Sequence, residues 1–148
     1  MSMSRRELCL LLPGALFPVA SIAIAKANAK DNSLPSAGYP FEKLTEKTLA
    51  SGARIRDVLK GKLATGESIE THETTLPPGV MPHPPHHHVH SEMFLLREGN
   101  VELTVSGTSY RLGAGAVGFV HSNEEHSVKN VGTTPATYFV VEMGPGVS

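Results

Sequence analysis

The sequence predicts an all-β domain, either a sandwich or a barrel. Three observations lead to this prediction. Apolar and polar residues alternate over short segments, β-branched residues are common in them, and glycine, proline or asparagine separates one segment from the next. After residue 52 no segment shows a sustained helical period. The chain has 148 residues, which is enough for one such domain around one hydrophobic core.

Residues 1–29 have the layout of a signal peptide. Arg5 and Arg6 form a short basic start, and an apolar run with small residues at its end follows. The adjacent arginines resemble a bacterial twin-arginine signal, although Leu10 stands where such signals usually carry lysine. A general secretory signal and an uncleaved anchor are the alternatives. We expect an exported protein, periplasmic or secreted, with no stable membrane insertion once the signal is removed.

Composition excludes several classes of function. The formal net charge is -1, and lysine and arginine do not cluster, so neither nucleic acid nor an acidic membrane surface is an expected partner. The only cysteine, Cys9, lies inside the signal. The mature chain would therefore have no thiol for a disulfide or a thiolate zinc site.

Residues 30–50 are expected to form a linker or extended arm, and residues 51–148 the all-β domain. The start of the arm is polar with proline and glycine, and residues 41–52 favour an edge strand or irregular structure. The segments of strand length that follow are 53–59, 67–76, 91–98, 100–106, 108–113, 116–121, 126–131 and 136–143. The residues expected to line the barrel are Phe94, Leu96, Val128 and Phe139.

The tract that begins at His86 suggests a metal site. In an extended chain His86, His88 and His90 point one way with Glu92, and His87 points the other. Neutral imidazole and carboxylate together suit divalent iron, manganese, nickel, cobalt or zinc. A further ligand is needed, and His126 on a later strand can supply it. The alternative is a surface histidine tract that binds metal adventitiously.

The spacing of this tract resembles the first motif of the cupin family. His86-x-His88 is followed by three residues and Glu92, then by six residues and Gly99. Gly79 lies one residue further from His86 than the usual spacer.

A second segment resembles the second cupin motif. It runs from Gly115 through five residues to His121, and its histidine and final asparagine are His126 and Asn130. His121 replaces the usual proline and Asn123 the usual glycine. Asparagine tolerates the left-handed turn that glycine would make, so we expect the turn to be kept.

The resemblance covers about residues 52–143 and implies a single antiparallel jelly-roll barrel. Its interior would hold one divalent transition metal on His86, His88, Glu92 and His126. On an octahedral ion four protein ligands leave about two positions for water, substrate or oxygen. A scaffold with an empty barrel is the alternative. Small cupins commonly pair through an edge strand, so a homodimer is expected.

Three further histidines are candidate catalytic acids or bases: His121, His90 and His72. His121 stands beside the second motif, and is otherwise an exposed turn residue. His90, like His83, is expected at the barrel mouth, where it either supports the ligands or is merely solvated. The parity of His72 permits an inward position. Tyr138 is a further candidate hydroxyl donor.

The first functional hypothesis is an exported metal-dependent enzyme that acts on a small organic molecule. An oxygenase and a lyase or isomerase are both compatible with the ligand set, because a fold does not determine the reaction. The second is a non-catalytic cupin that binds a metal or small ligand in the cell envelope. A structural protein-interaction module is the third.

Overall fold

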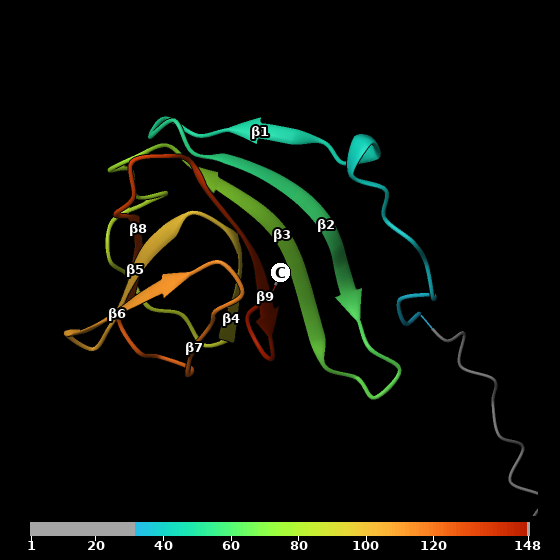
Figure 1. Cartoon of the computed structure of the whole chain (residues 1–148). Coiled ribbons are helices and arrows are strands. Elements are labelled where there is room, and N and C mark those ends of the chain that lie inside the picture. The colour runs from blue at the N-terminus through green and yellow to red at the C-terminus, as the bar shows by residue number, and fades with distance from the viewer. Residues whose placement is uncertain (1–31, 148) are drawn as a thin grey trace, which may run out of the picture.

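The computed structural model describes residues 32–147, so the predicted signal peptide lies outside the described residues (Figure 1). One short 3-10 helix, η1, precedes the strands. The elements are η1 (Phe41–Lys43), β1 (Glu46–Thr48), β2 (Arg54–Lys62), β3 (Ser68–Leu76), β4 (Ser91–Glu98), β5 (Asn100–Val105), β6 (Thr108–Gly113), β7 (Val117–Val120), β8 (His126–Asn130) and β9 (Ala136–Met143). No helix within residues 32–147 is long and apolar enough to cross a membrane.

The strands form two antiparallel sheets, as expected for a jelly-roll barrel. The larger has the order β1-β2-β3-β9-β4-β7 and the smaller the order β6-β5-β8. The large sheet curls, and the small sheet lies against its β4–β7 side (Figure 1). The predicted all-β class and jelly-roll architecture are therefore confirmed. Non-consecutive neighbours such as β3 and β9 bring distant parts of the sequence together on the inner face.

The eight segments predicted as strands are present as β2 to β9. The histidine tract differs from its expected form, because β4 begins only at Ser91 and the tract is a loop. Pro82, Pro84 and Pro85 lack the N–H that a strand ladder needs. His86 alone pairs with a strand: its N–H donates to the His126 carbonyl at 3.1 Å, and the reverse bond is 2.8 Å.

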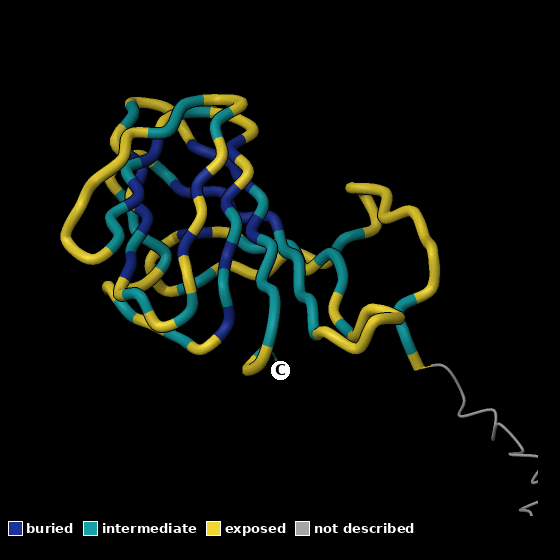
Figure 2. Tube along the Cα trace, turned by 90° about the horizontal axis from the view of Figure 1, so that it is seen from below, coloured by how far each residue is buried: buried dark blue, intermediate teal, exposed yellow. Residues whose placement is uncertain are grey.

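The arm behaves as an edge element. β1 pairs with β2, and Lys47 lies opposite Ile55. The residues around it are mostly exposed, in contrast to the buried centre of the barrel (Figure 2). Leu49 follows β1 and packs against the core, so the arm is tied to the barrel at this point.

The core lies between the two sheets. Phe94, Leu96 and Val128 are buried there, as predicted, each 5% exposed or less. The prediction for Phe139 is wrong. Phe139 lies opposite Glu73 and Leu95 on the outer face, and its neighbour Tyr138 points inward. Strand residues alternate between faces, so a shift of one residue in the assumed parity exchanges the two side chains.

Candidate metal centre

Six of the chain's histidines line one cavity inside the barrel. The cavity has a volume of about 160 Å³. The loop before β4, the start of β8 and strand β3 contribute the imidazoles, and β4 and β9 contribute Glu92 and Glu142. Apolar side chains, among them Phe94, Val128 and Val140, form the inner wall. The cavity therefore combines metal-ligand chemistry with a wall that excludes water.

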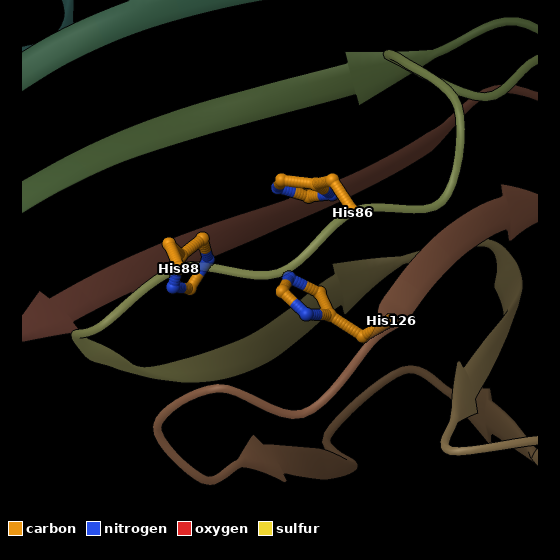
Figure 3. A group of neighbouring side chains, drawn as sticks. All are labelled: His86, His88 and His126. Carbon is orange, nitrogen blue, oxygen red and sulfur yellow. The ribbon is translucent and has the colours of Figure 1, made fainter.

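Three imidazoles converge in this cavity. His86 and His88 come from the loop and His126 from β8, and their rings border one common space (Figure 3). One ring nitrogen of each lies within 4.8 Å of those of the other two. Glu92 joins them: Oε1 lies 2.9 Å from His88 Nε2, and Oε2 lies 3.1 Å from His126 Nε2. The structure thus brings together the four residues that the cupin motifs select.

Hydrogen bonds fix the tautomers of two of these imidazoles. His88 Nδ1 donates to the His90 carbonyl at 3.0 Å, and His126 Nδ1 donates to the Glu124 carbonyl at 2.9 Å. Each bond holds the proton of the neutral imidazole on Nδ1, so Nε2 keeps its lone pair for a metal ion. Both Nε2 atoms are buried and make no well-directed hydrogen bond despite the nearby carboxylate, and His86 Nδ1 is also without one. Buried nitrogens without partners fit a bound metal ion, which would use those lone pairs.

The surroundings favour a neutral imidazole at His86 and an ionised carboxylate at Glu92, and they favour the protonated imidazole at His126. Burial and the neighbouring His83 and His126 lower the pKa of His86 to about 4. Burial raises the pKa of Glu92, but His126 and His88 lower it more, so the net shift is downward. Burial lowers the pKa of His126, but Glu92 and the Glu124 carbonyl raise it more. In the absence of an ion, His126 is therefore where a proton competes best with a metal.

The structure separates the three histidines predicted as acids or bases. His90 is buried, and its ring stacks on His88 with centroids 3.5 Å apart. His72 points into the cavity from β3, as its parity permitted. His121 lies outside the cavity, exposed in the turn before β8, where its Nδ1 donates to the Ser122 carbonyl at 3.1 Å. This turn contains Asn123 with φ +64°, the left-handed conformation expected from the motif.

Two other histidines occupy the places that the sequence suggested. His83 is exposed at the cavity mouth, and its ring meets that of His86 edge-on with centroids 4.1 Å apart. His87 is exposed. The sequence interpretation missed Glu142, which lines the cavity beside Glu92, its register partner on the neighbouring strand β4. Its signal was available, because Glu142 is the charged residue of an apolar strand and shares parity with Tyr138 and Val140.

Comparison with known proteins agrees with this architecture. Residues 72–142 match the family model of the cupin domain. No curated protein sequence matches the chain. The fold is the cupin fold, and the match over residues 72–142 supports placing the chain in the cupin superfamily.

Several solved structures share the fold at low sequence identity. An RmlC-like cupin from Shewanella frigidimarina is 18% identical with a TM-score of 0.62, over 75% of this chain and 94% of that one. A predicted oxalate decarboxylase from Thermotoga maritima is 20% identical with a TM-score of 0.61, over 73% and 99%. KdgF from Halomonas sp. is 13% identical with a TM-score of 0.63, over 73% and 94%. At these identities the likeness concerns the fold alone.

Proposed function

We propose that this protein is an exported cupin that binds one divalent transition metal and acts on a small organic molecule. The observation that carries the proposal is the convergence of His86, His88, His126 and Glu92, with buried ring nitrogens that lack hydrogen-bond partners. Three imidazoles and one carboxylate suit iron, manganese, nickel, cobalt or zinc. Export rests on the layout of residues 1–29, and pairing into a homodimer rests on the edge strand β1.

The protein's own groups would select and confine the substrate. The bound ion would act as a Lewis acid toward a substrate oxygen or would activate oxygen. Phe94, Val128 and Val140 line the inner end of the cavity and would hold the apolar part of a ligand. The Tyr138 hydroxyl lies on the same wall, and burial raises its pKa, so it would remain a protonated donor. A cavity of about 160 Å³ favours a small molecule over a polymer.

Elemental analysis of protein purified without a polyhistidine tag tests the metal site. Wild type should carry one tightly bound transition metal per chain, and His126→Ala should lose it. His87→Ala is the matched control: it removes an exposed imidazole of the same tract, so the metal should stay. Metal retained in His126→Ala and lost in His87→Ala would mean that the tract binds metal at the surface and would remove the basis for an enzyme.

The identity of the metal then selects the reactions to assay. Iron with exchangeable positions would direct the search to oxygen chemistry, whereas zinc or nickel would direct it to lyase and isomerase chemistry. A metal-loaded protein that catalyses none of these reactions, yet binds a small ligand at the ion, would overturn the enzyme proposal and favour the binding-protein alternative.

Light scattering tests the proposed homodimer, and a monomeric mass would refute it.

A further inference from the structure

Three glutamates lie side by side on the inner face of the large sheet. Glu70 of β3 is the register partner of Glu142 of β9, and Glu142 is the register partner of Glu92 of β4. Directly paired residues of neighbouring strands share a face, and like charges in such pairs are destabilising. The row ends at Lys60 of β2, whose ammonium lies 3.0 Å from Glu70 Oε2. His88 and His126 flank Glu92 at the other end, which leaves Glu142 in the middle.

A histidine completes a ligand set around the middle carboxylate. His72 of β3 places Nδ1 3.9 Å from Glu142 Oε1. Ligand atoms of Glu70, His72 and Glu142 all lie within 4.8 Å of one another. Burial lowers the pKa of His72, although nearby carboxylates raise it, so the imidazole stays in its neutral, metal-binding form. The three side chains are partly buried on two neighbouring strands, and His72 and Glu142 line the cavity.

A second observation, independent of these three side chains, points to the same place. His90 is 9% exposed, and neither of its ring nitrogens has a hydrogen-bond partner. Its Nε2 lies 3.4 Å from Glu142 Oε2 and 3.6 Å from Glu92 Oε1. A buried nitrogen without a partner, aimed between two carboxylates, is costly unless something else binds there.

The row holds more negative than positive charge. Glu142 lies between Glu70 and Glu92, and the ion-pair partners of Glu142 among the described residues are the imidazoles of His72 and His90. Lys60 is more than half exposed at the outer end of the row, so its charge is largely screened by solvent. A divalent ion beside Glu142 would neutralise the repulsion between the adjacent carboxylates.

We propose that Glu70, His72 and Glu142 form a second divalent-cation site at the side of the barrel cavity, next to the site of His86, His88, His126 and Glu92. Two carboxylates and one imidazole make a harder ligand set than three imidazoles and one carboxylate. The second site should therefore prefer Mn²⁺ more strongly than the first does. The proposal does not depend on the enzymatic role proposed above.

Titration of metal-free protein with Mn²⁺ tests the second site, with free ion followed by electron paramagnetic resonance. Wild type should bind two equivalents. Glu70→Gln and Glu142→Gln should weaken one equivalent by about tenfold or more and keep the other. His126→Ala should show the reverse pattern. Glu67→Gln is the matched control, because it is exposed just before β3 and should leave both equivalents unchanged.

A Lys60→Ala variant sharpens the test, because Lys60 is more than half exposed at the end of the row and its removal leaves the three proposed ligands in place. Removing the ammonium from Glu70 should tighten the second equivalent several-fold and leave the first unchanged. Saturation of wild type at one equivalent would overturn the proposal. So would a second equivalent that survives in both Glu70→Gln and Glu142→Gln, since the ion would then be held elsewhere, for example by exposed histidines.

Discussion

Glu73 and Glu142 are both largely buried carboxylates of the large sheet, but they lie on opposite faces with opposite surroundings. Glu73, on the outer face, is 2% exposed. Its Oε2 accepts a hydrogen bond from Arg97 Nη1 at 3.0 Å, and Arg56 Nη1 lies 3.5 Å from its Oε1. Glu142, on the inner face, has two carboxylate neighbours, and its ion-pair partners among the described residues are the imidazoles of His90 at 3.4 Å and His72 at 3.9 Å.

The difference shows that arginines of the chain compensate the buried carboxylate on the outer face, whereas the inner-face carboxylate has no such partner among the described residues. The guanidiniums of Arg56 and Arg97 compensate the Glu73 carboxylate. The Arg56 guanidinium also lies 4.4 Å from the centroid of the Phe41 ring, so Arg56 connects the arm to the barrel. No arginine or lysine contacts Glu142 among the described residues. A charge compensated within the chain serves stability, whereas a charge left without a fixed cation is suited to bind one.

The largest expected effect comes from removing the compensation on the outer face. The double variant Arg56→Ala/Arg97→Ala leaves Glu73 buried without a cation. The free energy of unfolding should fall by about 3 to 5 kcal/mol, as when one member of a buried ion pair is removed. Chemical denaturation at pH 7 measures the change.

A third substitution separates lost charge compensation from lost packing. Glu73→Leu in the double variant replaces the carboxylate with an apolar group of similar volume and should restore a large part of the stability. A triple variant no more stable than the double variant would show that the arginines act mainly through their contacts with Phe41 and the sheet.

The strands could be predicted because their signals are local. Alternation marks strands such as β3 and β5, and turn residues such as Asn123, which is left-handed just before β8, mark the breaks between strands. The grouping of His86, His88, Glu92 and His126 could be predicted because these residues match the spacing of the two cupin motifs.

The carboxylate row could not be predicted, because it depends on strand pairing. Glu70 and Glu142 become neighbours only through the register of β3 against β9, which no local pattern encodes. His121 is the opposite case. It is close to His126 in sequence, but it is exposed in the turn before β8, whereas His126 lines the cavity.

On the inner face, neutralising Glu142 should stabilise the metal-free protein. Its pKa is raised from 4.5 to about 7 in the fold, so the folded state holds a proton that the unfolded state releases. The stability is present below pH 4.5 and is lost as the pH rises through about 7. Glu142→Gln should therefore be more stable than wild type at pH 8, by about 2 kcal/mol once the full value of the shift is reduced for solvent screening, and equal to it at pH 4.

Denaturation curves in the presence of a chelator at both pH values measure this difference. Glu42→Gln, at an exposed position of the arm, is the control and should follow wild type at both. An equal free energy of unfolding for wild type and Glu142→Gln at both pH values would mean that solvent screens the carboxylate row. Glu142 would then be no less compensated than Glu73.

Metal affinity at the His86, His88, His126 and Glu92 site should fall on acidification. Glu92 and the Glu124 carbonyl raise the pKa of His126 above its usual value despite burial, so His126 takes up a proton first. Below that pKa the apparent affinity should drop by about tenfold per pH unit. His86, with a pKa of about 4, should add a second loss only near that pH. Calorimetric titration between pH 4 and 8 checks this order, and an affinity that stays constant down to pH 5 would contradict it.

The smallest expected effect comes from an ion pair that neither face buries. Lys47 of β1 and Asp57 of β2 pair across the sheet edge, with side chains 62% and 51% exposed. Exposed pairs contribute little because water screens their attraction and ordering two side chains costs entropy. Asp57→Ala should change the free energy of unfolding by about 0.5 kcal/mol or less. A loss near that of the Arg56→Ala/Arg97→Ala variant would show that the sheet responds to any broken ion pair. Burial would then not be what distinguishes Glu73 and Glu142 from the other charged residues of the sheet.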